Sequence, residues 1–197
     1  MCLVVCQVLF NLWIFNHYAA LMYVDGAGRH HGLAKYLISK GVKVKIFCAD
    51  VLHGRDETIE IKDGKYSCRM GTDGVEYVII KTSEYKNNGF SRIKNMMDYY
   101  FKVRKIADKI AKEEGKPDII LASSVHPLAL IAGEKFAKKH HIPCLCEVRD
   151  LWPQTLVELG YLGEKRLITR LMYRGEHSIY RKSQGVIFTM PGGKDYI

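Results

Sequence analysis

Residues 117–148, PDIILASSVHPLALIAGEKFAKKHHIPCLCEV, contain a strand, a helix and a second strand in immediate succession. The apolar run at residues 119–122 predicts the first strand, and helical spacing predicts a helix over about residues 127–139. Residues 143–148 are apolar again and predict the second strand. Strands joined by a helix of this length lie parallel, so this stretch predicts an α/β fold with a parallel sheet.

The same alternation continues on both sides of this stretch. Further strands are predicted at residues 8–15, 42–49, 75–81 and 185–190, and further helices at about residues 29–40, 91–114 and 165–182. In the helix at 29–40, Leu33, Tyr36 and Leu37 form the expected apolar stripe. A chain of 197 residues is long enough for one well-buried domain and short for two. We therefore expect one Rossmann-like domain with helices on both faces of its sheet.

Composition limits the classes of partner. Hydrophobic residues make up 48% and charged residues 26%, as in a folded domain, and the formal net charge is +9. This charge favours anionic partners such as phosphates, an acidic lipid surface or nucleic acid. No nucleic-acid-binding motif accompanies the basic residues, so no nucleic-acid partner is predicted. The apolar residues 1–15 lack the basic start of a secretory signal and are short for a membrane span, which favours a buried first strand.

Cysteine and histidine spacing predicts neither a metal site nor a cofactor. The six cysteines form no CxxC pair, and they are Cys2, Cys6, Cys48, Cys68, Cys144 and Cys146. Those in apolar runs are expected to be free, buried thiols of a cytoplasmic protein. The neighbouring pairs His30–His31 and His140–His141 are poor joint ligands, because adjacent side chains diverge on a helix.

Candidate site residues lie in three loops. Ligands of parallel sheets bind beyond the C-terminal ends of the strands, which selects residues 16–28, 123–127 and 149–154. In the first loop, Gly26 and Gly28 precede a helix, where close backbone approach and free N–H groups suit a phosphate, and Arg29 adds a charged donor. The alternative is that these glycines serve only as a turn.

A dinucleotide site is the alternative ligand site at the same loop. Asp50 ends the second predicted strand, where an acid that binds ribose would lie. However, the glycines follow the pattern Gly26-x-Gly28-x-x-x-Gly32 and stand about ten residues beyond the first strand. Both features depart from the GxGxxG fingerprint and argue against NAD or FAD.

The second loop contains Ser123, Ser124 and His126 between a strand and a helix. The serine hydroxyls can cap the helix, and His126 can hydrogen-bond a sugar hydroxyl or a developing phosphate charge, or have a purely structural role. No GxSxG sequence is present, so a serine hydrolase is not expected.

The third loop, Glu147-Val-Arg149-Asp150-Leu-Trp152-Pro153, is the densest polar and aromatic segment. An Arg149–Asp150 pair can brace the loop above a packed Trp152. Alternatively, Asp150 accepts hydrogen bonds from the acceptor's hydroxyls while Trp152 stacks on a sugar face. The basic, amphipathic helix at 91–114 has two interpretations as well: it lies on an anionic bilayer, or it has a solvated face opposite a core stripe.

Six segments, in this order, resemble bacterial family 4 glycosyltransferases, the retaining GT-B enzymes of capsule and O-antigen assembly. They are IFNHYA (14–19), GAGRHHGLAKYLISKG (26–41), GFSRIKNMMDYYF (89–101), SSVHPLA (123–129), EVRDLWPQ (147–154) and IFTMPGGKDYI (187–197). The pattern is similar to the subgroup that adds an N-acetylated amino sugar, such as a fucosamine, to a lipid-linked acceptor.

The resemblance implies a role for each candidate residue. Gly26, Gly28 and Arg29 would contact the donor diphosphate, and His126 and Asp150 would be the catalytic residues. Acceptor-binding residues would be Ser124, Arg149 and Trp152.

The resemblance also implies a domain arrangement and a location. Residues 1–197 would be the N-terminal, acceptor-side domain of a two-domain transferase whose donor-binding domain is absent from this sequence, so the chain alone would be inactive. The partners would be a nucleotide-sugar and a lipid-linked or polysaccharide acceptor, at the inner face of the plasma membrane. The alternative is a module that binds the acceptor or a membrane surface without catalysis.

Overall fold

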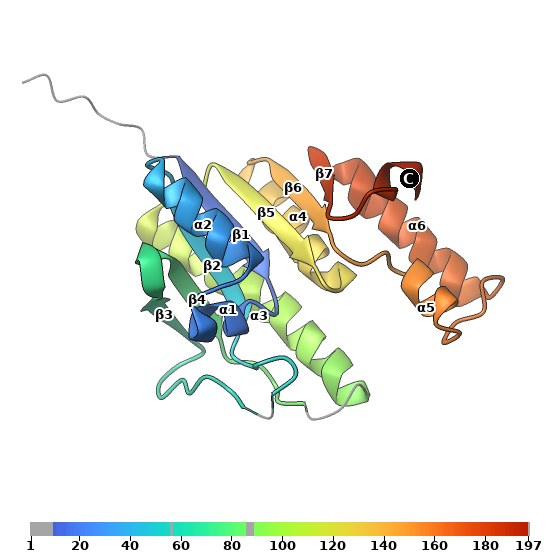
Figure 1. Cartoon of the computed structure of the whole chain (residues 1–197), viewed down its shortest axis with the longest axis horizontal. Helices are drawn as coiled ribbons and strands as arrows, with labels where there is room; N and C mark the ends of the chain where they lie inside the picture. Colours follow the sequence, from blue (N-terminus) through green and yellow to red (C-terminus); the bar gives the residue numbers. More distant parts are fainter. Residues whose placement is uncertain (1–9, 56, 86–88, 197) are drawn as a thin grey trace, which may run out of the picture.

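The computed structural model describes residues 10–55, 57–85 and 89–196 (Figure 1). Strands and helices alternate through most of the chain. The strands are β1 (Asn11–Asn16), β2 (Lys43–Ala49), β3 (Tyr66–Met70), β4 (Glu76–Ile80), β5 (Ile119–Ser124), β6 (Cys144–Val148) and β7 (Gly185–Phe188). The helices are α1 (Ala20–Asp25), α2 (Arg29–Ser39), α3 (Phe90–Glu114), α4 (Pro127–His140), α5 (Gln154–Glu158), α6 (Leu167–Lys182) and α7 (Gly193–Tyr196), with a 3-10 turn at Thr72–Gly74.

The strands form one sheet in the order β3-β4-β2-β1-β5-β6-β7. Every neighbouring pair is parallel except β3 and β4, which are antiparallel. The predicted α/β fold with a mostly parallel sheet is therefore confirmed. The edge strand β3 and the short helix α1 were not predicted, because both are too short to show a clear hydrophobic period. Residues 8 and 9 of the predicted first strand, with Cys2 and Cys6, lie outside the described residues.

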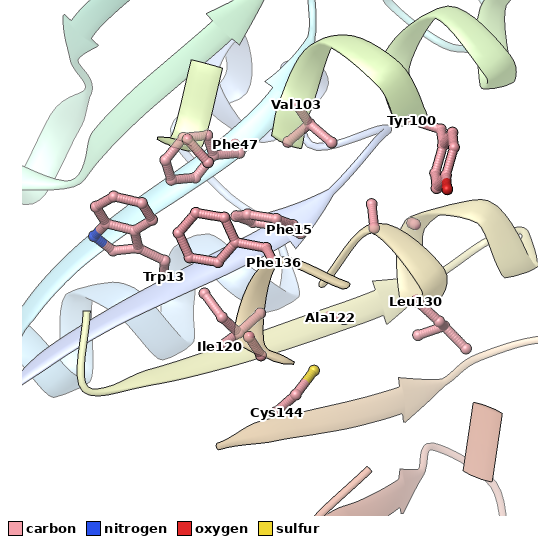
Figure 2. Packing of buried hydrophobic residues seen from close by; sticks show 14 of the residues in the cluster. Trp13, Phe15, Phe47, Tyr100, Val103, Ile120, Ala122, Leu130, Phe136 and Cys144 are labelled. Atoms are coloured by element: carbon pink, nitrogen blue, oxygen red, sulfur yellow. The ribbon is translucent and has the colours of Figure 1, made fainter. Parts of the chain in front are cut away.

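Helices cover both faces of the sheet, as expected. On one face, α3 and α4 pack against a cluster of aromatic rings (Figure 2). The rings of Trp13 and Phe47 lie 4.9 Å apart, and Phe136 of α4 lies 5.6 Å from both Trp13 and Phe15. Helix α2 covers the other face, where Ala34 packs in a second cluster with Ile14 and other strand residues.

The predicted apolar stripe of α2 was correct only for Leu37, which is half-buried and packs against the second core cluster. Leu33 and Tyr36 are 37% and 60% exposed, and the helix instead buries His30, His31 and Ala34. Both histidine rings bond to groups on other elements, so they are satisfied when buried, whereas the hydrophobic period alone could not reveal those partners. The two imidazoles do diverge as expected: His30 bonds to β6 and His31 bonds to Tyr77 on β4.

The buried cysteines follow the sequence interpretation. Cys48, Cys144 and Cys146 are free thiols inside strands, where they pack as small hydrophobic residues. Cys68 is free and exposed on the edge strand β3.

Gly133 sets how closely α4 approaches β5. A Cβ at this position would lie 2.5 Å from the Cβ of Ala122, and the neighbouring atoms belong to the buried sheet. We expect Gly133→Ala to lower the free energy of unfolding by about 1–3 kcal/mol through overpacking. Urea titration followed by circular dichroism measures this change. In the matched control Gly32→Ala, within α2, the new methyl group meets no atom within 4 Å, so equal losses in both variants would contradict the packing argument.

Candidate functional site

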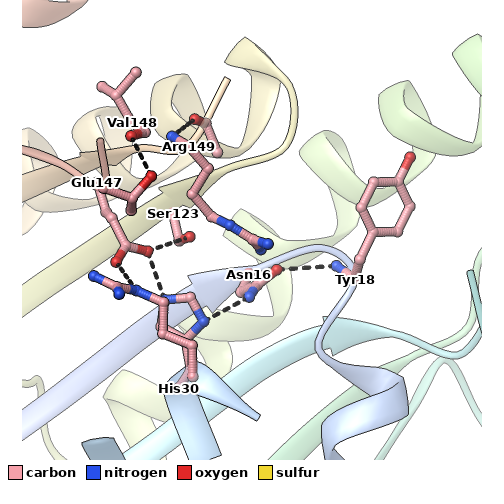
Figure 3. Close-up of polar contacts among 10 residues, drawn as sticks. Asn16, Tyr18, His30, Ser123, Glu147, Val148 and Arg149 are labelled. Atoms are coloured by element: carbon pink, nitrogen blue, oxygen red, sulfur yellow. Dashed lines mark hydrogen bonds and ion pairs between the residues drawn. The ribbon is translucent and has the colours of Figure 1, made fainter. Parts of the chain in front are cut away.

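The three selected loops meet at the C-terminal edge of the sheet. They follow β1, β5 and β6, which are neighbours in the centre of the sheet. Asn16, Ser123 and Glu147 lie in register across these strands and carry polar side chains at this edge (Figure 3). All three residues are nearly fully buried.

Glu147 holds this edge together. The residue is 3% exposed, and its carboxylate accepts hydrogen bonds from Arg29 Nε, His30 Nε2 and Ser123 Oγ, each at 2.7 Å. Burial by itself raises the pKa of this carboxyl, but the hydrogen bonds from His30, Ser123 and Arg29 outweigh it and lower the pKa to about 2. The group is therefore a carboxylate at neutral pH, and it joins the start of α2 to β5 and β6.

Asn16 orients the His30 ring. The Asn16 carbonyl Oδ1 accepts from the backbone N–H of Tyr18 at 3.1 Å, so its amide nitrogen donates to His30 Nδ1 at 2.9 Å. This bond assigns the imidazole proton to Nε2, the atom that donates to Glu147. Figure 3 shows the resulting path from Tyr18 through Asn16 and His30 to Glu147.

Backbone conformation and close packing explain both glycines of the first loop. Gly26 and Gly28 have φ values of 59° and 115°, which side chains rarely adopt. A Cβ on Gly26 would lie 2.8 Å from Thr72 Oγ1, and one on Gly28 would lie 2.9 Å from Met22 Cγ. The turn interpretation alone therefore explains these glycines, and a phosphate contact stays a prediction.

The loop nevertheless places Arg29 at the start of α2. Glu147 binds its guanidinium through Nε, while the side chain as a whole stays 54% exposed. The terminal amino groups of Arg29 have no other partner among the described residues. Arg149 extends from the end of β6 toward Asn16 and Tyr18 (Figure 3), and its guanidinium likewise bonds to no described residue. One guanidinium group thus binds the buried carboxylate of Glu147, and a second lies at the same edge of the sheet without contacting that carboxylate.

His126 lies deeper than its predicted role suggests. The ring is 1% exposed, and its Nε2 lies 2.6 Å from His17 Nδ1. Burial, assisted by the positive charge of Arg92, lowers the pKa of His126 to about 3. A neutral ring brings no positive charge to a phosphate, so two of the predicted roles remain: hydrogen bonding to a hydroxyl and a purely structural role.

His126 and His17 share one hydrogen bond. It joins His126 Nε2 to His17 Nδ1 at 2.6 Å, and either ring can be the donor, depending on the tautomer. The second nitrogen of His126, Nδ1, has no hydrogen-bond partner among the described residues. This buried nitrogen is therefore open to a partner that the chain itself does not supply.

The third loop is braced differently from the prediction. No ion pair joins Arg149 and Asp150, and the Asp150 side chain is exposed. Instead, the Arg149 backbone N–H donates to Ser124 Oγ at 3.2 Å, and Trp152 Nε1 donates to the backbone oxygen of Val125 at 3.1 Å.

The predicted acceptor-binding residues do not line one common cavity. Ser124, Asp150 and Trp152 line one cavity of about 10 Å³, far below the size of ligand pockets. Arg149 lines a larger, open cleft of about 500 Å³ together with Thr189 and Met190 beyond β7. The structure brings Arg29 to Glu147, but records no contact between His126 and Asp150.

Four residues of this site were given no role in it by the sequence analysis: Asn16, His17, His30 and Glu147. The available signal was the polar sequence Asn16-His17-Tyr18 directly after an apolar strand. Glu147 interrupts another apolar strand, where an acid needs partners to be buried. Neither signal identifies the partner across the sheet.

Two further features were searched for among the described residues: a metal site and a membrane-spanning helix. Among the described residues, no three His, Cys, Asp or Glu side chains are grouped so that they can hold a metal ion. In the same part of the chain, no helix combines the length and the apolarity needed to cross a membrane.

Comparisons with known proteins were made in sequence and in structure. No curated protein matches the chain in sequence. Among solved structures, it is similar to CalG4, the calicheamicin glycosyltransferase, with 10% identity and a TM-score of 0.49. That alignment covers 89% of this chain and 43% of CalG4, so the chain spans less than half the length of that protein. The sequence model of the glycosyl transferase 4-like domain matches residues 25–197, which is most of the chain. The chain therefore belongs to the glycosyl transferase 4-like domain family.

Proposed function

We propose that this chain is the acceptor-side domain of a retaining glycosyltransferase. The enzyme would move a sugar from a nucleotide-sugar to a lipid-linked or polysaccharide acceptor in bacterial surface polysaccharide synthesis. Family membership supports the reaction class. The observation that carries the site assignment is Arg29, which Glu147 holds at the start of α2 with its outer N–H groups open.

Arg29 suits a departing diphosphate. Transfer from a nucleotide-sugar leaves negative charge on the diphosphate, and prepositioned cations or helix ends stabilise it. The 2.7 Å bond from Arg29 Nε to Glu147 fixes the guanidinium plane, so its remaining donors point in a set direction. The free N–H groups at the start of α2, after Gly28, favour the same charge.

His126 has a different part in the proposal. Its Nδ1 has no partner among the described residues and would form a hydrogen bond with a sugar hydroxyl, a group that can both donate and accept. Because Nδ1 is buried, the sugar reaches it only after a neighbouring side chain moves. Tyr18, with its ring centroid 5.9 Å from that of His126, is one such neighbour.

Arg149, Asp150 and Trp152 are proposed to meet the acceptor. They belong to the loop after β6, and Arg149 borders the open cleft of about 500 Å³. Such a cleft has room for a sugar of the acceptor, while the exposed carboxylate of Asp150 can accept from its hydroxyls.

Titration of the diphosphate site tests the proposal. In amide NMR spectra of the ¹⁵N-labelled chain, UDP and UDP-N-acetylglucosamine should shift the signals of Gly28, Arg29 and His30 in a saturable manner. Arg29→Gln should weaken this binding by about tenfold, the effect of one charge-assisted hydrogen-bonding group.

The matched control is Lys40→Gln, which removes one positive charge at the opposite end of α2. It should bind UDP as the unaltered chain does. A titration without saturable shifts, or equal affinities for Arg29→Gln and the unaltered chain, would contradict the assigned diphosphate site.

A further inference from the structure

The beginning of α6 exposes an unusual amount of apolar surface. Leu167, Ile168 and Leu171 are 74%, 55% and 52% exposed, although they lie within one turn of each other. The opposite face of the helix packs inward through Thr169 and Ile179. Apolar side chains gathered in one place on a surface commonly mark a site of interaction.

Basic residues surround these three side chains. Lys165, Arg166, Arg170 and Arg174 are all exposed, and none of them forms an ion pair with a residue that the structure describes. Glu164 is the only acidic residue between positions 159 and 174. Apolar side chains beside uncompensated positive charge are complementary to an anionic lipid surface.

The beginning of α3 repeats this combination. Phe90, Ile93, Met97 and Phe101 are 90%, 56%, 38% and 47% exposed, and their spacing places them in one stripe along the helix. The exposed Lys94 and Lys105 flank the stripe.

The core stripe of α3 is separate from this exposed one. Tyr99, Val103, Ile106 and Ile110 are buried and form the core stripe that one of the two sequence interpretations predicted for this helix. That interpretation places a solvated face opposite the core stripe and does not explain why apolar side chains are exposed on the helix.

The two apolar groups lie at the same edge of the molecule. Figure 1 shows the starts of α3 and α6 extending past the C-terminal ends of β1 and β5. This is the edge that carries Glu147, Arg29 and Arg149. We call Phe90, Ile93, Met97 and Phe101 of α3, with Leu167, Ile168 and Leu171 of α6, the docking face.

We propose that the docking face seats this domain on an anionic lipid bilayer. Its apolar side chains enter the boundary between headgroups and acyl chains, and the neighbouring lysines and arginines contact lipid phosphates. The sheet edge with Arg149 then lies near the headgroups, where the sugar of a lipid-linked acceptor is found. This inference rests on the proposed function only in naming that acceptor.

Vesicle co-sedimentation of the 197-residue chain tests the docking face. We expect binding to vesicles of equal parts phosphatidylcholine and phosphatidylglycerol, and little binding to phosphatidylcholine alone. Binding should weaken as salt is raised, because salt screens the attraction between exposed charges.

Two double variants separate the apolar from the ionic contribution. Leu167→Ser with Leu171→Ser should weaken binding to the mixed vesicles by about tenfold, through loss of inserted apolar area. Arg170→Gln with Arg174→Gln should weaken it by about fivefold per charge removed and flatten the salt dependence. Circular dichroism should show an unchanged fold for both variants, since the altered side chains are exposed.

A matched control lies on the other face of the sheet. Tyr36→Ser with Lys40→Gln also removes a large exposed apolar side chain and a positive charge, from α2. This control should sediment with vesicles as the unaltered chain does.

Three results would overturn the proposal: no binding to the mixed vesicles, equal loss in the α2 control, or self-association through the docking face. Sedimentation velocity detects the last as a dimer that disappears in the leucine double variant. Neither nucleotide nor sugar is present in these experiments. A failure here is therefore distinct from a failure of the Arg29 titration.

Discussion

Replacing Glu147 by glutamine is expected to lower the free energy of unfolding by about 3 kcal/mol at neutral pH. Glutamine keeps the shape but removes the charge and turns one acceptor atom into a donor. Of the three groups that donate to Glu147, at least one of Arg29, His30 and Ser123 then loses its acceptor in a buried place. Urea unfolding followed by circular dichroism measures the loss.

The loss of stability in Glu147→Gln should depend on pH. The folded pKa of Glu147, about 2, is below the ordinary value of 4.5, so its contribution is fully present above about pH 4.5. It is lost as the pH falls toward 2, because the folded state then has to bind the same proton as the unfolded state. The stability difference between the unaltered chain and Glu147→Gln should therefore shrink between pH 4.5 and 2.

Glu113→Gln is the matched control for this prediction. Glu113 is exposed on α3, and its carboxylate lies 3.9 Å from Lys109 Nζ. Loss of this exposed ion pair should lower the free energy of unfolding by less than about 0.5 kcal/mol. A difference between the unaltered chain and Glu147→Gln that is small, or constant with pH, would show that Glu147 does not hold the sheet edge together.

Phe136→Ala should destabilise the domain by about 3–5 kcal/mol, the cost of emptying a large aromatic site in a core. Phe136 is 1% exposed on α4, and its ring packs between those of Trp13 and Phe15 (Figure 2). The variant loosens the contact between α4 and the sheet, and α4 begins directly after His126. Thermal and urea unfolding measure the loss.

Phe101→Ala is the comparison for Phe136→Ala, because Phe101 is 47% exposed on the neighbouring helix α3. It should change the free energy of unfolding by less than about 0.5 kcal/mol. Similar losses in the two variants would mean that the aromatic cluster does not govern stability.

Much of the fold could be predicted from local pattern. The strands β2, β4, β5, β6 and β7 and the helices α2, α3, α4 and α6 lie within a few residues of the predicted segments. Each of these has either a continuous apolar run or a helical period, both of which are local properties. The edge strand β3 has neither: its residues alternate between half-buried and exposed, and only pairing with β4 defines it.

The candidate site was predictable only as a location. The rule for parallel sheets indicated the loops after β1, β5 and β6, and the structure brings these loops to neighbouring strands. The predicted contact between Arg149 and Asp150 is not formed. The contact that is formed, between Arg29 and Glu147, joins residues 118 positions apart.

The amino-acid sequence by itself determined the α/β architecture, because the apolar period and the length of each helix are properties of consecutive residues. It also determined which loops lie at the C-terminal edge of the sheet. Only the tertiary structure decided that His30 and His31 are buried while Tyr36 is exposed, and that burial keeps His126 neutral. The physical reason is that a polar side chain can be buried only beside its partners, and these partners come from distant strands.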